Sequence, residues 1–250
     1  MRYPEDYVNR IIQGDCLEVM QHIPDRSVDM ILCDLPYGTT ACEWDTVIPF
    51  EPLWEQYRRI IKDNGVIVLT ASQPFTSALV MSNIKMFKYC WYWDKKQGTG
   101  FLNSKKQPLK SIEEVVVFYK EQSTYNPQMR LGFKPYTCKQ GDTKTQNYGK
   151  QTVAITVSDG SRYPLNIIEF IRDKEKTHPT QKPVALFEYL IKTYTNEGDL
   201  VLDNCAGSGT TGVACKNINR NYILIEINPE YCDIAHKRLA NVPMRFEGFI

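Results

Sequence analysis

The first segment whose residue types and spacing suggest chemistry is VDMILCDLPYGTT. Its apolar part, Val28 to Cys33, has the composition of a buried strand, and open α/β sheets bind ligands beyond the carboxyl ends of their strands. Four candidate residues follow directly: Asp34, Leu35, Pro36 and Tyr37. On a rigid turn, the carboxylate can accept hydrogen bonds from a planar amino group, while the aromatic ring can stack on the ring that carries this amino group. The same residues are also typical of an Asp-initiated β-turn with a packing tyrosine.

A second segment, GDLVLDNCAGSGTTG, joins a short apolar run to a glycine-rich loop that opens a helix. About 20 residues later another apolar run ends in Glu226, and an acidic residue at that distance suits a ribose diol. The spacing fits neither GxGxxG nor GK[ST], so the loop predicts a nucleoside-bearing cofactor of another kind; a connecting turn without a ligand is the alternative. The candidate loop residues are Asp203, Ala206, Gly207, Ser208, Gly209, Thr210 and Thr211.

A third segment, THPTQKP, places polar residues just before Pro183, at the expected start of a helix. The residues are His178, Thr180, Gln181 and Lys182. Polar side chains at a helix start are often caps. Because this segment precedes the glycine loop, the same side chains could also close over its ligand, and the sequence leaves both interpretations open.

Short apolar runs alternate with segments of helical period, which predicts an α/β fold with a mainly parallel sheet. We expect strands over 10–13, 28–33, 65–70, 115–119, 200–202 and 222–226. We expect helices over 16–22, 52–61, 74–83, 183–195, 210–217 and 229–242, four of them with a proline in the first turn, where its missing N–H costs nothing. The alternation fails over 121–176, which predicts an insertion between two halves, 1–120 and 177–250.

Charge is spread unevenly over the 250 residues. The chain has 30 Lys and Arg against 29 Asp and Glu, but residues 95–150 hold 11 basic and only 4 acidic residues. Such a segment can reach a phosphate backbone, although a solvated loop is an equally simple interpretation. The lysines that could contact such a phosphate backbone are Lys95, Lys96, Lys105, Lys106 and Lys110.

Several classes of protein are excluded by what the sequence lacks. The N-terminus has no apolar core of a signal peptide and no run of 18 apolar residues occurs, so we expect a soluble, cytoplasmic protein without a membrane partner. The 8 cysteines form no CxxC pair, and no histidine stands at metal-ligand spacing. We therefore expect no metal site and no disulfide framework.

Together the segments resemble the S-adenosylmethionine-dependent DNA amino-methyltransferases, which act on adenine N6 or cytosine N4. The order of the segments is similar to the permuted β group, in which the catalytic motif precedes the cofactor motif. The resemblance covers nearly the whole chain, including the WYWDKK block and IEINPEY. The chain differs from the family pattern in two places: Leu35 stands where the family usually has proline, and Asn204-Cys205 stand where the family usually has Pro-Phe.

The resemblance implies a Rossmann-like methyltransferase fold, with a mainly parallel seven-stranded sheet, helices on both faces and an inserted target-recognition region. It implies methyl transfer to adenine N6 of a base flipped out of double-stranded DNA. Tyr37 would stack on that base, while Asp34 and the Leu35 carbonyl would accept hydrogen bonds from its amino group. No cysteine nucleophile is required.

The cofactor implied by the resemblance is S-adenosylmethionine, with Glu226 at the ribose hydroxyls and Lys182 beside the carboxylate. The cofactor-binding residues that we expect are Asp15, Cys16, Asp34, Thr180, Gln181, Lys182, Asp203, Ala206, Gly207, Ser208, Gly209, Thr210, Thr211 and Glu226. Residues 121–176 would carry target recognition, with Tyr125, Arg130, Tyr136, Gln146 and Arg162 as candidates for base contacts or for an internal core of the insertion.

Three alternatives remain at this stage. Cytosine N4 can occupy the same acceptor geometry, although Asp at position 34 favours adenine in the family. A DNA-binding relative without activity would keep the fold. A nucleotide-dependent oxidoreductase is disfavoured by the glycine spacing. We expect a prokaryotic or phage-encoded protein linked to restriction-modification; the recognition sequence and a homodimer stay open.

Overall fold

The computed structural model describes residues 2–39, 45–140, 143–145, 149–151, 154–173 and 181–243. The chain divides into two compact units. The larger one combines Met1–Asn126 with Asn166–Ile250, and the smaller one is Pro127–Leu165. Among the described residues, no helix is both long and apolar enough to cross a membrane.

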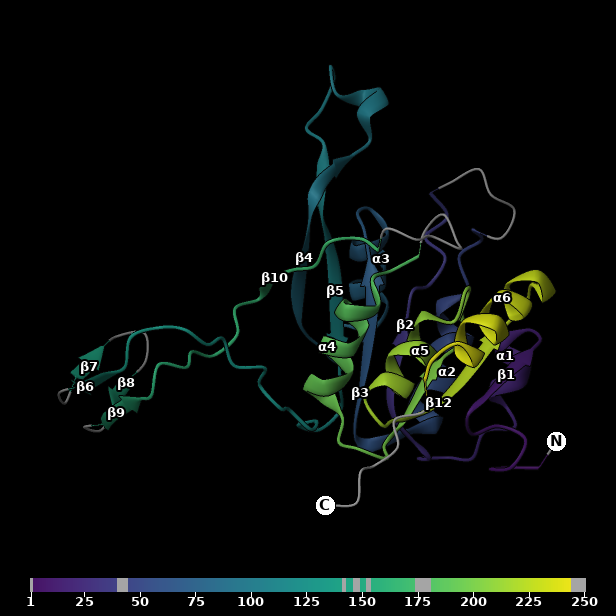
Figure 1. Cartoon of the computed structure of the whole chain (residues 1–250), viewed down its shortest axis with the longest axis horizontal. Coiled ribbons are helices and arrows are strands. Elements are labelled where there is room, and N and C mark those ends of the chain that lie inside the picture. The colour runs from purple at the N-terminus through teal and green to yellow at the C-terminus, as the bar shows by residue number, and fades with distance from the viewer. Residues whose placement is uncertain are drawn as a thin grey trace. The chain divides into compact units, whose positions relative to one another are not determined.

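The larger unit is built on one eight-stranded sheet (Figure 1). Across the sheet the order is β1 (Arg10–Gln13), β12 (Asn221–Glu226), β11 (Leu200–Asp203), β2 (Val28–Cys33), β3 (Ile61–Ala71), β5 (Lys110–Phe118), β4 (Phe87–Thr99) and β10 (Ile167–Glu169). Only β5 pairs antiparallel with its neighbours. The other seven strands therefore end at the same edge of the sheet, and that edge collects the polar residues that follow them.

The predicted mainly parallel α/β fold is confirmed, and the six predicted strands are all present within a few residues. The predicted number of seven strands is wrong by one, because the three-residue strand β10 pairs with Tyr92–Asp94 at the edge. Sequence analysis also missed β4 as a strand. Its aromatic residues alternate in burial, since Trp91 and Trp93 face the core while Tyr92 is exposed, but it continues into a lysine-rich segment that reads as a loop.

Helices cover both faces of the sheet, as the alternation predicts. α1 (Cys16–Met20), α2 (Phe50–Ile60) and α3 (Phe75–Ser82) pack on one face. α4 (Val184–Tyr194), α5 (Thr210–Asn217) and α6 (Pro229–Ala240) pack on the other, and Figure 1 shows α4 and α5 in front of the sheet. Strand β2 is buried on both sides, with Ile31 in one core and Met30 and Leu32 in the other. A parallel strand between two helical layers has this composition.

The prolines mark the helix starts. Pro229 is the first residue of α6, Pro74 and Pro183 are the N-caps of α3 and α4, and Pro52 is in the first turn of α2. The first N–H groups of a helix have no helical partner, so a proline there loses no hydrogen bond.

Strands β4 and β5 continue beyond β3 as a two-stranded ribbon (Figure 1). The pairing of β5 with β3 ends at Glu114, whereas its pairing with β4 continues to Lys110. The ribbon closes through the 3-10 turn η1 (Phe101–Asn103), which follows Gly100 in the left-handed region at φ 85°. The predicted lysine-rich loop is therefore the end of a β-hairpin.

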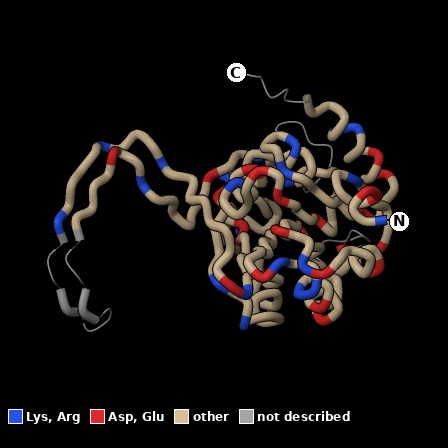
Figure 2. The backbone as a smooth tube through the Cα atoms, turned by 90° about the horizontal axis from the view of Figure 1, so that it is seen from below, with Lys and Arg blue, Asp and Glu red and all other residues tan. Residues whose placement is uncertain are grey.

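The smaller unit consists of two antiparallel strand pairs, β6 (Tyr136–Gln140) with β9 (Ala154–Ser158) and β7 (Thr143–Thr145) with β8 (Gly149–Gln151). This unit spans fewer residues than the insertion expected over 121–176, because the chain from Asn166 onward belongs to the larger unit and pairs with its sheet. The Arg162 guanidinium lies 5.3 Å from the ring centroid of Phe133 and 4.5 Å from that of Tyr136. Basic residues outnumber acidic ones among its described residues (Figure 2).

Candidate active site

The turn after β2 is held by a carboxylate that sequence analysis missed. The Asp45 carboxylate accepts hydrogen bonds from the backbone N–H groups of Tyr37 at 2.7 Å, Gly38 at 2.9 Å and Thr39 at 2.9 Å. Leu35 is buried in the core beneath the turn. The turn is therefore anchored on both sides, and its polar side chains are presented in a fixed arrangement.

The Asp34 carboxylate lies where β2 ends and accepts hydrogen bonds from three side chains. The Tyr37 hydroxyl donates to Oδ1 at 2.7 Å, the Thr70 hydroxyl donates to the same oxygen, and Lys182 Nζ donates to Oδ2 at 2.6 Å. Thr70 lies on the adjacent strand β3, and Lys182 directly precedes α4. An ionised carboxylate has about four lone-pair positions, so one acceptor position is left for a further donor.

Lys182 also takes part in a wider cluster of charges. Its Nζ lies 3.6 Å from Oε2 of Glu113, and Oε1 of Glu113 faces Lys95 Nζ at 3.1 Å and Arg172 Nη2 at 3.4 Å. Burial by itself lowers the pKa of Lys182, but the Asp34 and Glu113 carboxylates outweigh it and raise that pKa. Lys182 is therefore cationic at neutral pH and stays paired with Asp34.

The ring of Tyr37 stacks on that of Phe75, with centroids 5.1 Å apart and an interplanar angle of 25°. Lys182 Nζ lies 5.6 Å from the centroid of the Tyr37 ring. Burial, followed by the Asp34 and Glu113 charges, raises the pKa of the Tyr37 hydroxyl well above its usual value. The hydroxyl is thus a proton donor at any physiological pH.

The glycine loop follows β11 and is closed by two carboxylates. Asp203 accepts hydrogen bonds from the Thr211 hydroxyl and, at 3.1 Å, from the Cys205 N–H. Glu226, at the end of β12, accepts from the N–H of Gly207 at 2.7 Å and from that of Asn228 at 2.9 Å. Burial raises the pKa of Asp203 to about 6, although its hydrogen-bond donors oppose the shift.

Two further features fix the shape of this loop. Gly209, the N-cap of α5, has φ 78°, and a Cβ there would lie 2.8 Å from that of Ala235 on α6. A larger residue would be both strained and crowded. Arg238, also on α6, donates to the carbonyl of Ser208 at 2.7 Å, to its hydroxyl at 2.8 Å and to the Thr210 hydroxyl at 3.1 Å.

Asn204 and Cys205, which differ from the family pattern, are integrated into the core. The Tyr57 hydroxyl on α2 donates to Oδ1 of Asn204 at 2.6 Å. Cys205 interacts with Cys16 and with Cys33. The hydrogen bond with Cys16 lowers the pKa of the Cys205 thiol, but the contact with Cys33 and burial outweigh it and raise that pKa well above its ordinary value. These thiols are protonated and unreactive at neutral pH.

The turn after β2 and the glycine loop after β11 line one cavity of about 800 Å³ at the carboxyl edge of the sheet. Of the expected site residues, the cavity lining contains Asp15, Cys16, Asp34, Leu35, Pro36, Tyr37, Gln181, Lys182, Asp203, Ala206, Gly207, Ser208, Thr210 and Glu226. Gly209 and Thr211 are not among the lining residues, since they shape the loop from behind. Thr180 lies outside the described residues, as do His178 and Gln146.

Lys182 and Asp15 have partners within the protein at the cavity. Lys182, which is expected beside the cofactor carboxylate, pairs with Asp34 and Glu113. Asp15 lines the cavity and also caps α1, since its carboxylate accepts from the N–H of Leu17 at 2.7 Å. Gln181 donates to Oδ2 of Asp173 at 3.3 Å. Asp15 and Gln181 thus reach the cavity from the start of α1 and from the segment before α4.

The five expected DNA-binding lysines fall into two groups. Lys95 is 3% exposed and pairs with Glu113, while Lys96 pairs with Asp94 at 3.2 Å and Glu169 at 2.6 Å. Lys95 thus lies in the cavity rather than on a surface that could meet a phosphate. The sequence does not reveal this position, because Glu113 lies on the opposite strand of the ribbon. Lys105, Lys106 and Lys110 are exposed on the hairpin.

The cavity suits an adenosine-bearing ligand with an amino-acid end. Glu226 supplies a carboxylate acceptor, the Gly207 segment allows close approach of backbone, and Ile227 and Tyr231 add apolar surface. Among the described residues, no group of three or more His, Cys, Asp or Glu side chains is placed to hold a metal ion. The residues missed by sequence analysis are Asp45, Thr70, Glu113, Arg172 and Arg238, none of which belongs to a recognisable motif.

Comparisons with known proteins agree with this geometry. The chain is 28% identical to the type II methyltransferase M.HpaI of Haemophilus parainfluenzae, over 96% of this chain and 76% of the relative. It is 29% identical to the DNA adenine methyltransferase YhdJ of Escherichia coli strain K12, over 92% of this chain and 82% of the relative.

Solved structures show the same fold. The M1.HpyAVI–SAM complex superposes with a TM-score of 0.63 at 27% identity, covering 92% of this chain and 99% of that one. The cytosine-N4-specific PvuII DNA methyltransferase reaches a TM-score of 0.65 at 18% identity, covering 94% and 88%. The sequence model of the N6/N4 DNA methylases matches residues 28–237. Because this match spans most of the chain, from β2 to α6, the chain belongs to the DNA methylase family.

Proposed function

We propose that this protein is a site-specific DNA methyltransferase that transfers a methyl group from S-adenosylmethionine to N6 of an adenine flipped out of double-stranded DNA. The observation that carries the proposal is the shared cavity. It brings the Asp34–Tyr37 turn, which suits a planar amino group, next to the Glu226 loop, which suits a nucleoside. A methyl donor and an acceptor can therefore meet within one pocket.

Residues at three strand ends would hold the cofactor. The Glu226 carboxylate would accept hydrogen bonds from the ribose hydroxyls, and the Gly207 and Asn228 N–H groups fix the orientation of this carboxylate. Asp15 and Cys16, which line the cavity, would face the adenine edge, and Ser208 and Thr210 would face the amino-acid end. The cofactor supplies an electrophilic methyl group on sulfur. Everything else in the reaction is positioning by the protein.

The amino nitrogen of adenine is a weak nucleophile, because its lone pair is delocalised into the ring. Asp34 accepts one amino N–H and the Leu35 carbonyl accepts the other, so the lone pair is directed toward the methyl group. Tyr37 supports the ring by stacking. The Lys182 ammonium lies 2.6 Å from the Asp34 carboxylate, and this carboxylate stabilises the positive charge that develops on the nitrogen during transfer. The transfer needs no covalent enzyme intermediate.

Adenine is favoured over cytosine on two grounds. An aspartate occupies the first position of the catalytic turn, which in the family resemblance leans toward adenine. One relative that matches most of the chain is an adenine methyltransferase. The matched type II methyltransferases are bacterial proteins, which supports a cytoplasmic, prokaryotic or phage-encoded enzyme of restriction-modification. The Pro127–Leu165 unit would contribute target recognition, since Arg130, Lys134 and Arg162 give it a basic character.

A base-resolved methylation map of DNA from cells that express the protein tests the proposal. N6-methyladenine within one short sequence, absent from cells that express Asp34→Ala, is the expected result. Detection of N4-methylcytosine instead would show that cytosine, not adenine, is the substrate. A map identical to that of the Asp34→Ala cells would contradict the proposed activity.

A further inference from the structure

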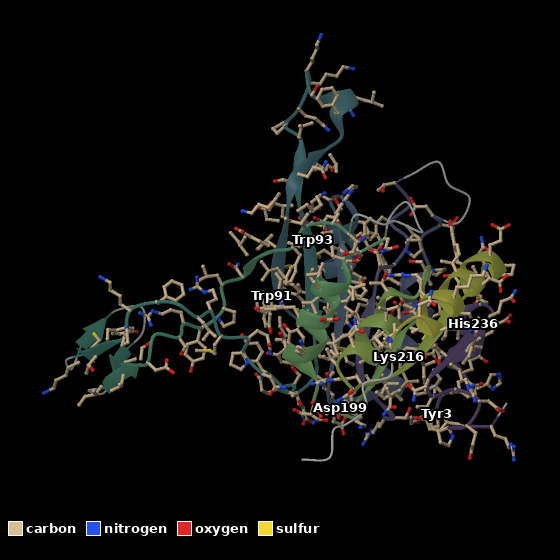
Figure 3. The ribbon with its side chains drawn as sticks, in the orientation of Figure 1. Tyr3, Trp91, Trp93, Asp199, Lys216 and His236 are labelled. Carbon is tan, nitrogen blue, oxygen red and sulfur yellow. The ribbon has the colours of Figure 1, made fainter. Side chains whose placement is uncertain are left out.

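The tip of the β4–β5 hairpin exposes two large apolar side chains that no other described part of the protein covers. Phe101 is 78% exposed and Leu102 is 100% exposed. Figure 3 shows the side chains of the tip standing clear of the rest of the larger unit. Scattered apolar residues are common on surfaces, but two adjacent ones at the end of a projecting ribbon need a specific explanation.

The backbone of the tip is ordered by its own hydrogen bonds. The N–H of Asn103 donates to the Gly100 carbonyl at 2.9 Å, that of Ser104 to the Phe101 carbonyl at 3.0 Å, and that of Lys106 to the Asn103 carbonyl at 2.8 Å. At the neck of the tip, Leu109 packs against Gly98, where a Cβ would lie 2.8 Å from the Leu109 Cβ. The tip thus presents Phe101 and Leu102 on a fixed turn without contacts from the sheet.

Charge identifies the partner of this surface. Lys105 and Lys106 follow the apolar pair directly and are exposed, and the tip segment 100–109 contains no acidic residue. Apolar side chains flanked by lysines suit a duplex, whose phosphates attract the ammonium groups while its stacked bases accept an apolar wedge.

The hairpin also begins at the active site. Trp93, Lys95, Thr99 and Lys110 of its two strands line the same cavity as Asp34. A duplex whose target base enters this cavity therefore lies along the ribbon that carries the tip. Extrusion of a base leaves a gap between stacked bases, and apolar side chains such as Phe101 and Leu102 suit this gap.

Resting on the proposed function, we propose that Phe101 and Leu102 form a wedge that enters the base stack beside the target nucleotide and stabilises the flipped state. Lys105 and Lys106 hold the phosphates on either side of the wedge. The wedge acts on the position of the base and takes no part in methyl transfer itself.

The test uses the full-length protein and a duplex carrying the mapped target sequence, with 2-aminopurine at the target position. This base becomes fluorescent when it leaves the stack. We expect Phe101→Ala with Leu102→Ala to lower the fluorescence gain at saturating protein at least fivefold. On the natural duplex kcat falls at least tenfold, and on a duplex with a mismatch opposite the target it stays within about threefold of wild type.

Two control variants accompany this test. Met81→Ala with Ile84→Ala removes exposed apolar surface near the end of α3 and leaves flipping unchanged. Lys105→Gln with Lys106→Gln weakens binding and its salt dependence but keeps the fluorescence gain at saturation.

Unchanged fluorescence in the double alanine variant would overturn the wedge, and so would a kcat loss that the mismatch does not rescue. Loss of a dimer in sedimentation by the same variant would also overturn it, because a second copy would then cover the tip. Wild-type protein that flips the base but methylates nothing would contradict the proposed function alone, since the fluorescence needs no methyl transfer.

Discussion

The Nζ of Lys182 lies 2.6 Å from Oδ2 of Asp34 and joins the segment before α4 to the turn after β2. These residues are 148 positions apart in the chain. Under the proposed function, this pair makes Lys182 a positioning residue for the Asp34 carboxylate.

Replacing Lys182 separates this role from cofactor binding. In Lys182→Met, Asp34 loses a charged donor, so we expect kcat to fall about a hundredfold, while the Kd for S-adenosylmethionine in calorimetry stays within about threefold of wild type. Lys192→Met, at an exposed position on α4, is the matched control and leaves both values unchanged. A Kd that rises as much as kcat falls would return Lys182 to the cofactor carboxylate.

Tyr37 combines a hydroxyl that donates to Asp34 with a ring that lies against Phe75. Tyr37→Phe keeps the ring and removes one of three donors to Asp34, so we expect a loss in kcat/KM of about fivefold, equivalent to about 1 kcal/mol. Tyr37→Ala also removes the stacking surface, and we expect at least a further tenfold loss. Equal losses in the two variants, measured by steady-state kinetics on one duplex, would show that stacking on Tyr37 contributes nothing.

Arg238 ties α6 to the glycine loop through Ser208 and Thr210. Removing its donors in Arg238→Met loosens the loop, and we expect the Kd for S-adenosylmethionine to rise about tenfold, which corresponds to about 1.4 kcal/mol. The exposed neighbour Lys237 provides the control Lys237→Met. If both variants bind the cofactor like the wild type, the loop keeps its shape without Arg238.

Asp203 makes the stability of the folded protein depend on pH. Its folded pKa of about 6 lies above the ordinary value of 3.8, chiefly because the carboxyl is buried. The folded state therefore holds this proton more tightly than the unfolded state does. The stability from that proton is fully present below pH 3.8 and is lost as the pH rises through 6, by about 3 kcal/mol in total.

Urea unfolding at pH 4.5 and 7.5 measures this effect. We expect the free energy of unfolding of the wild type to fall, between these values, by about 2 kcal/mol more than that of Asp203→Asn. Asp233→Asn, at an exposed site on α6, is expected to keep the wild-type difference. Parallel pH curves for wild type and Asp203→Asn would mean that the buried carboxyl titrates normally.

The sequence predicts most of the sheet because the signals are local. A buried parallel strand such as Val28–Cys33 is a continuous apolar run, and its carboxyl end is marked by Asp34. The glycine loop is equally local, since Gly207 and Gly209 adopt positive φ and Glu226 closes it from the next strand. Strand ends, and therefore the location of the cavity, follow from these patterns.

The partners of the site residues depend on the tertiary structure and leave no local signal. Asp45 stands 8 positions after Tyr37, whose N–H it accepts, and Glu113 meets Lys95 only because β4 and β5 pair. The lysine-rich ribbon reads as a loop, because its strands are stabilised by pairing with each other and not by burial of both faces. In addition, the register between β4 and β5 shifts between Asp94 and Thr99, which interrupts the regular alternation of side chains between the two faces of the strand.

Identifying the methylated nucleoside tests most directly the proposal that Asp34 directs methyl transfer to adenine N6. Purified protein is incubated with S-adenosylmethionine and DNA, the DNA is digested to nucleosides, and the methylated nucleoside is identified by mass. We expect N6-methyladenine with the wild type and at least a thousandfold less with Asp34→Ala at equal cofactor binding. N4-methylcytosine with the wild type, or undiminished N6-methyladenine with Asp34→Ala, would contradict it.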